Sequence, residues 1–64
     1  MKACVVGVGD MGLAVAWALQ QLGFELQLIE SDKSKFSKIK KVLGIKLKRP
    51  NYPEEMEPCD VVVS

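Results

Sequence analysis

The 64-residue sequence contains no histidine, only two cysteines, and few aromatic residues: one Trp, one Tyr and two Phe. Without histidine it lacks the commonest general acid–base group and a frequent zinc ligand. Two cysteines are too few for a disulfide framework, and we expect Cys4 and Cys59 to be reduced thiols on neighbouring strands. We therefore expect neither a catalytic constellation nor a metal site in this chain.

Long hydrophobic runs are also missing, which excludes a transmembrane helix of the usual length. The N-terminus leads directly from Lys2 into a short apolar run, without the longer region of a signal peptide. We expect a cytoplasmic protein with no membrane partner. Eight of the nine basic residues lie between positions 33 and 49. We interpret them as a solvated helix face and not as a nucleic-acid surface, because few aromatic residues are available to stack on bases.

Three glycines form the most informative pattern that is present. Gly7, Gly9 and Gly12 follow an apolar run at residues 3–6 and open an alanine-rich segment, in the order Gly-x-Gly-x-x-Gly. Between a strand and a helix, this motif is typical of dinucleotide binding. We expect Gly7 to turn the chain sharply, Gly9 to admit a pyrophosphate, and Gly12 to let the helix pack closely on the strand.

A second apolar run ends in an acid, Glu30, about 20 residues after the glycines. We expect the N–H groups of Asp10 and Met11 to bind the phosphates, with the Asp10 carboxylate directed away. Glu30 is placed to accept hydrogen bonds from the ribose hydroxyls and to repel a 2′-phosphate, which favours NAD. Three nearby residues favour NADP instead, because they would hold a 2′-phosphate: Ser31, Lys33 and Lys35. NADP therefore remains an alternative cofactor.

The hydrophobic pattern predicts alternating strands and helices. We expect strands at residues 2–8, 24–30, 45–48 and 60–64, and helices at residues 10–22 and 33–43. The inner stripe expected for the first helix consists of Met11, Val15, Leu19 and Leu22, with Ala14 and Ala18 beside it. The link between the last two strands is too short for a full crossover helix, and we expect a loop or a single turn there.

This order predicts an α/β fold, the three-layer Rossmann-type βαβαβ half with a parallel sheet and strand order 3-2-1-4. In such sheets the ligand lies at the carboxyl ends of the strands, where the strand order reverses. We therefore expect Ser64, which follows the last strand, to lie at the rim of the site. We interpret residues 1–64 as the N-terminal part of a dinucleotide-binding domain in a longer chain.

Residues 1–12 and 14–17 resemble the N-terminus of saccharopine dehydrogenase-like oxidoreductases, and residues 59–64 resemble the fourth strand of that family. The resemblance covers most of the chain. It implies an NAD(P)-dependent oxidoreductase that acts on an amino-acid-derived substrate. It also implies a separate catalytic and dimerisation domain downstream, so that the partners would be the cofactor, the remainder of the parent chain and a second subunit.

A non-enzymatic alternative stays open at this point. Regulatory Rossmann modules of ion-transport systems also bind nucleotides, and there the ligand changes a docking surface without reacting. A larger substrate domain with acid–base residues after Ser64 would support the enzyme, and a chain ending after two more strands would support the sensor.

Overall fold

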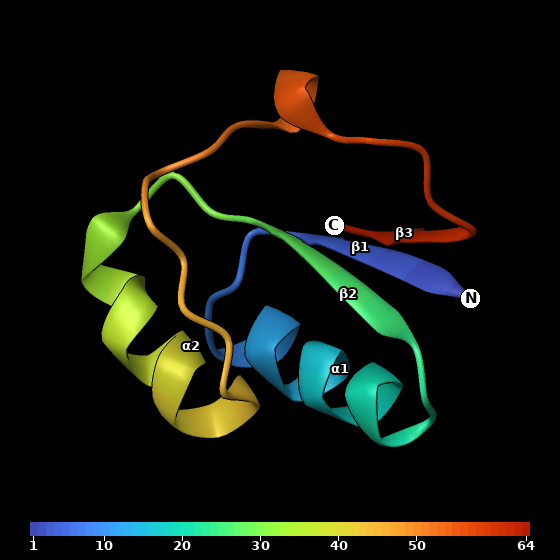
Figure 1. The fold of residues 1–64 in the computed structure, drawn as a ribbon. Coiled ribbons are helices and arrows are strands. Elements are labelled where there is room, and N and C mark those ends of the chain that lie inside the picture. Colours follow the sequence, from blue (N-terminus) through green and yellow to red (C-terminus); the bar gives the residue numbers. More distant parts are fainter.

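A three-stranded parallel sheet with β1 at its centre organises the chain, which the computed structural model describes over residues 1–64 (Figure 1). The order across the sheet is β2-β1-β3, and both neighbours run parallel to β1. The elements are β1 (Lys2–Val6), α1 (Asp10–Gln21), β2 (Glu25–Ile29), the 3-10 turn η1 (Lys33–Lys35), α2 (Phe36–Leu43), the 3-10 turn η2 (Pro53–Glu55) and β3 (Val61–Val63). The α/β class, the parallel sheet and both helices are thus confirmed.

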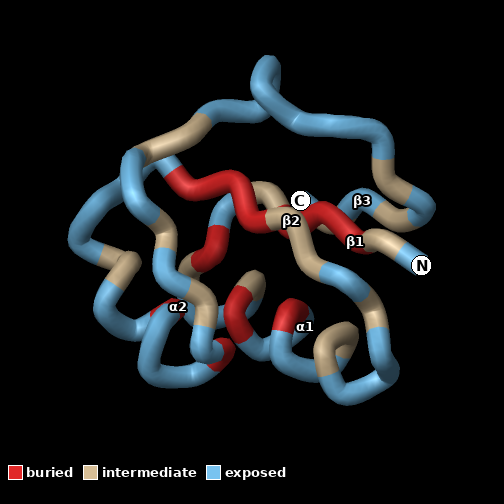
Figure 2. The backbone as a smooth tube through the Cα atoms, in the orientation of Figure 1, coloured by how far each residue is buried: buried red, intermediate tan, exposed pale blue.

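Both helices lie on the same face of the sheet, and η2 lies on the opposite side (Figure 1). Val5 and Leu28 are opposite each other in the β1–β2 register, and both belong to the core on the helix side. The core also contains Val8, Leu13, Ala16, Ile39 and Leu43. Figure 2 shows the buried backbone concentrated in β1, the end of β2 and the inner sides of the helices. One helical layer and the sheet are present, and a second helical layer is not.

Helix α2 lies within residues 33–43, the range expected for the second helix. Ile39 and Leu43 are buried, whereas Lys40 and Lys41 are exposed on the outer side. The helix ends at Gly44, whose φ of 72° places it in the left-handed region that glycine adopts without a Cβ penalty.

The third strand expected at residues 45–48 is wrong. These residues have no regular structure, and Ile45 and Leu47 pack against the core as partly buried side chains. The chain reaches the free edge of β2 only at Asn51. There the Asn51 N–H donates to the Glu30 carbonyl (3.1 Å), and the side-chain amide donates to the Leu28 carbonyl (2.8 Å) and accepts from the Glu30 N–H (2.6 Å). One residue thus satisfies three backbone groups of Leu28 and Glu30 at the end of this edge.

Helix α1 has 12 residues, and neither helix is long and apolar enough to cross a membrane.

The inner stripe expected for α1 is wrong in part, because Met11 and Leu22 are 85% and 75% exposed. The buried residues are Leu13 and Ala16. The rotation of α1 about its axis is set by Gly12, the third glycine of the motif, which packs against the turn. Residues i, i+4 and i+7 share a helix face, so Ala16 and Leu19 face the sheet together with Gly12.

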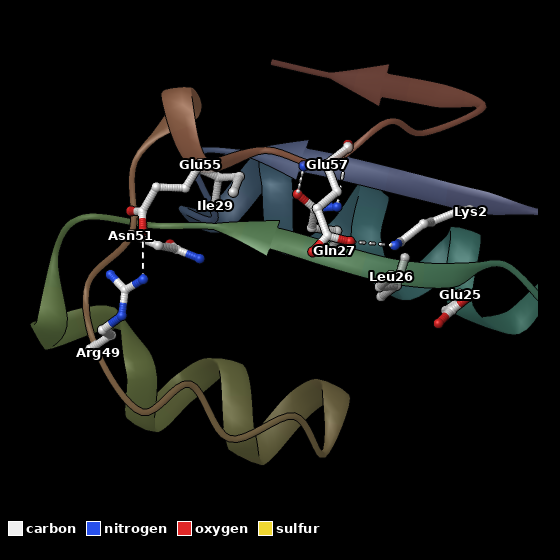
Figure 3. Close-up of a pocket in the computed structure, with 9 residues that line it drawn as sticks. All are labelled: Lys2, Glu25, Leu26, Gln27, Ile29, Arg49, Asn51, Glu55 and Glu57. Carbon is white, nitrogen blue, oxygen red and sulfur yellow. Dashed lines mark hydrogen bonds and ion pairs between the residues drawn. The ribbon is translucent and has the colours of Figure 1, made fainter.

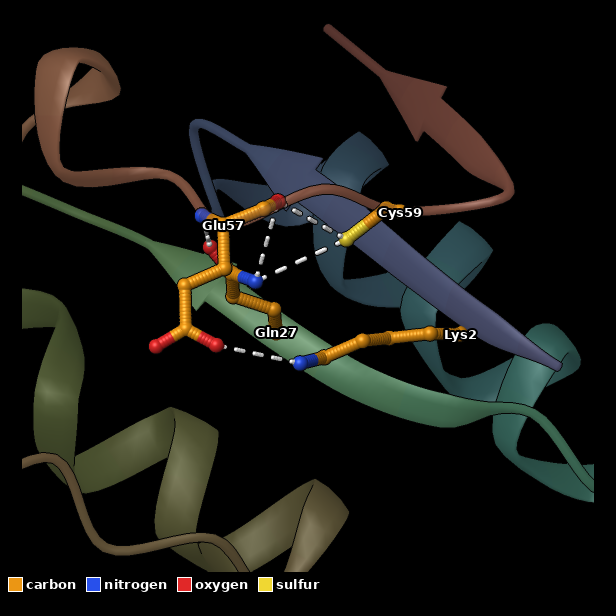
Figure 4. Close-up of polar contacts among 4 residues, drawn as sticks. All are labelled: Lys2, Gln27, Glu57 and Cys59. Carbon is orange, nitrogen blue, oxygen red and sulfur yellow. Dashed lines mark hydrogen bonds and ion pairs between the residues drawn. The ribbon is translucent and has the colours of Figure 1, made fainter.

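The face of the sheet opposite the helices is crossed by the chain that leads from η2 to β3. Gln27 connects to this segment, because its side-chain oxygen accepts the Glu57 N–H (2.9 Å) and its amide nitrogen lies 3.5 Å from Cys59 Sγ (Figure 4). Lys2 forms an ion pair with Glu57 (3.3 Å). Cys4 lies beneath and is fully buried; its burial, together with the nearby Cys59 thiol, raises the pKa of the Cys4 thiol. Both cysteines are free thiols.

Candidate functional site

The glycine turn joins the carboxyl end of β1 to the start of α1. Gly7 has a φ of 84°, which L side chains rarely adopt, and its N–H donates to the Ile29 carbonyl at the end of β2 (2.9 Å). Gly9 is the N-cap of α1, and no side chain caps this helix. The N–H groups of Gly9, Asp10 and Met11 find no acceptor within the chain. Uncapped N–H groups at the positive end of a 12-residue helix form a favourable environment for a phosphate.

Gly12 provides the close contact between this helix and the turn. A Cβ added to Gly12 would lie 2.2 Å from the Gly7 carbonyl oxygen and 3.6 Å from Val5 Cγ1. A Cβ on Gly9 would meet only the Lys35 ammonium, at 3.4 Å. The third glycine is therefore required by packing, whereas the second leaves the turn open on the side where Lys35 lies.

Asp10 and Met11 present their backbone and not their side chains to the turn. The Asp10 carboxylate is exposed and pairs with Lys38 of α2 (3.1 Å), so it is directed towards the second helix. The Met11 side chain lies in solvent. The Asp10 carboxylate therefore does not cap the helix, and the N–H groups at its N-terminus stay available.

Glu30 lies at the end of β2 beside the turn, and only 5% of it is exposed. Its Oε1 accepts the Val8 N–H (2.7 Å), and its Oε2 accepts the Asp32 N–H (2.8 Å). The carboxylate thus ties the glycine turn to the chain after β2. The sequence did not predict these two hydrogen bonds, because it indicated Glu30 only as an acceptor for ribose hydroxyls. Each oxygen keeps a second lone pair, but the access to it is narrow.

Ser31 lines a hollow of about 150 Å³ beside this carboxylate, together with Gly7, Asn51 and Pro53. Ser64 is exposed and directly follows β3, whose last residue, Val63, lies opposite Val5 of β1. The expected residues around the ends of β1 and β2 are therefore brought together, and Ser64 lies one strand away.

Two residues gain importance from the structure. Asn51 was not among the expected site residues, because no signal in one sequence shows which strand edge its amide will pair with. Lys35 extends from the junction of η1 and α2 to the glycine turn, and its Nζ lies 3.9 Å from Glu30 Oε1. A hollow of about 280 Å³ lies beside it, lined also by Gly9, Ser34 and Lys38. The turn offers a phosphate-bearing ligand free N–H donors and the Lys35 ammonium, while Lys38 and Asp10, which also line the hollow, are paired with each other.

A third hollow, of about 370 Å³, lies along the free edge of β2 (Figure 3). Its charged residues are largely paired with one another: Lys2 with Glu57, and Arg49 with Glu55. The pairing with Arg49 lowers the pKa of Glu55, and Glu55 in turn raises the pKa of Arg49. None of the three motif glycines lines this hollow.

Asp32 gives the site a pH-dependent element. Its carboxylate accepts hydrogen bonds from the Ser34 hydroxyl (2.7 Å) and the Ser34 N–H (3.0 Å), and these bonds lower the pKa of Asp32. Because the folded pKa is depressed, this stabilisation is present above the ordinary value of about 3.9 and is lost as the pH falls through the folded pKa. We expect an NMR titration to give Asp32 a pKa below that value, and Ser34→Ala to move it back towards it. An unchanged Asp32 pKa in Ser34→Ala would contradict the hydrogen-bond assignment.

Comparison of the chain with family models, with curated proteins and with solved structures gives no match.

Proposed function

We propose that this chain is the NAD(P)-binding segment of an oxidoreductase that resembles the saccharopine dehydrogenase-like enzymes. The observation that carries the proposal is the uncapped N-terminus of α1 behind a glycine turn, with a carboxylate at the end of the adjacent strand. The turn would hold the pyrophosphate, and the residues around Glu30 would hold the adenine ribose. The bound nicotinamide would supply hydride transfer, on an amino-acid-derived substrate, with the acid–base groups contributed from outside these residues.

Asp10 allows a test that removes a single N–H group without disturbing the fold. Proline is favoured at the first position of a helix, and the residue before it must be extended, as Gly9 is (φ −79°, ψ −165°). Asp10→Pro should therefore fold, but it lacks one of the N–H groups proposed to bind phosphate. Asp10→Ala is the matched control, since it removes the same exposed ion pair with Lys38 and keeps the N–H.

We expect the wild-type chain and Asp10→Ala to bind NADH, NADPH or ADP-ribose in a fluorescence or calorimetric titration. Asp10→Pro should bind about tenfold more weakly, because a hydrogen bond to a charged group contributes about 1.5–3 kcal/mol. Circular dichroism on the same samples checks that all three fold. Equal affinities of Asp10→Pro and Asp10→Ala, or a folded wild-type chain that binds none of these ligands, would contradict the proposal.

A further inference from the structure

Two lysines line the hollow at the glycine turn, and Lys35 is the one that is not paired with Asp10. Its Nζ lies 3.9 Å from Glu30 Oε1 and close enough to Gly9 that a Cβ there would be 3.4 Å away. Its neighbours do not compete for this position, because Lys33 is exposed and Lys38 is paired with Asp10. Lys35 is both the last residue of η1 and the N-cap of α2, so its backbone lies where the side chain can extend to the turn.

The Glu30 carboxylate, in contrast, is directed into the protein. Both of its oxygens accept buried or partly buried backbone N–H groups, from Val8 and Asp32, and almost none of its surface is exposed. An acid at this position discriminates against a 2′-phosphate by offering an exposed negative charge to the ribose. Here that charge is offset by two hydrogen bonds and by Lys35, so the repulsion on which the preference for NAD depends is weak.

We propose that Lys35 makes this site select dinucleotides that carry a phosphate on the 2′-oxygen of the adenine ribose, the NADP class, over those with a free hydroxyl. The inference rests on the proposed function and adds the specificity of that site. A ribose 2′-oxygen near Glu30 lies within reach of the Lys35 ammonium, because the two charged groups are themselves only 3.9 Å apart. A dianionic phosphate gains a charge-assisted hydrogen bond from that ammonium, and a hydroxyl gains much less.

The test compares two ligands that differ only in this phosphate. ADP-ribose and 2′-phospho-ADP-ribose are titrated calorimetrically against the wild-type chain, Lys35→Gln and Lys40→Gln, at a fixed ionic strength. Lys40 is a matched control, because it is an exposed lysine on the same helix and does not line the hollow beside Gly9. We expect the wild type and Lys40→Gln to bind 2′-phospho-ADP-ribose about tenfold more tightly than ADP-ribose, and Lys35→Gln to lose most of that ratio.

The outcomes separate this inference from the proposed function. If ADP-ribose binds and the 2′-phosphate brings no gain in the wild type, the selectivity is overturned and the dinucleotide site stands. If the gain persists in Lys35→Gln, Lys35 is not its source and the inference is again overturned. If the folded wild type binds neither ligand, the proposed function fails and the selectivity fails with it.

Discussion

Replacement of Gly12 by alanine is expected to destabilise the chain by about 3 kcal/mol, a large share of its total stability. The added Cβ would lie 2.2 Å from the Gly7 carbonyl oxygen. This oxygen belongs to the backbone of the turn, so it cannot rotate away as a side chain could. Overpacking of this kind costs about 1–3 kcal/mol and occasionally more. A chain of this length has about 3–10 kcal/mol of stability in total, at roughly 0.05–0.15 kcal/mol per residue.

The sign of this effect discriminates between two physical accounts of the helix. By intrinsic propensity alone, alanine stabilises a helix interior by about 1 kcal/mol relative to glycine, so Gly12→Ala should raise the stability. The packing of α1 against the turn gives the opposite result. Urea unfolding followed by circular dichroism measures the difference directly.

Gly9→Ala is the matched control for this experiment. Its new Cβ would meet only the end of the Lys35 side chain, at 3.4 Å, and that flexible chain can move. We expect a change of less than about 1 kcal/mol in the free energy of unfolding. A Gly12→Ala protein as stable as Gly9→Ala would show that α1 can shift on the sheet, and the close contact at Gly12 would lose its assigned role.

The same contact explains why the sequence predicted the existence of α1 but not its buried face. Met11, Val15, Leu19 and Leu22 recur at helical spacing, as a core stripe does. Hydrophobicity alone cannot recognise that two small residues, Gly12 and Ala16, mark the face in contact with the sheet. The preference for small residues arises from the distance between helix and turn, which is a tertiary property.

The missed third strand has a similar origin. Residues 45–48 alternate apolar and basic side chains, which is typical of a strand with one solvated face. In the structure Ile45 and Leu47 instead complete the core near α2, and Asn51 provides the hydrogen bonds at the edge of β2. The Gly7 turn was predictable because its role depends on the adjacent backbone. The pairing of Asn51 depends on where a distant strand ends.

Glu30 is the residue for which the sequence predicted a place but not the main local role. We expect Glu30→Gln to lower the melting temperature of the ligand-free chain by about 10 °C. Both carboxylate oxygens accept backbone N–H groups, whereas a glutamine side chain has one oxygen and one NH₂. One of the two N–H groups then faces a donor, and a buried unsatisfied N–H costs about 1–3 kcal/mol. For a small domain, 1 kcal/mol corresponds to about 4–8 °C.

Glu25→Gln is the matched control, since it makes the same exchange at an exposed acid on the same strand, and its melting temperature should stay within about 2 °C of wild type. The measurement is a thermal scan by circular dichroism without ligand. If Glu30 served only to contact a ribose, Glu30→Gln would be as stable as Glu25→Gln in that scan. A large loss of stability instead means that dinucleotide binding by any Glu30 variant has to be measured below its own melting transition. Only there does a weaker affinity report a contact with the ligand and not the loosening of the glycine turn that Glu30 holds to β2.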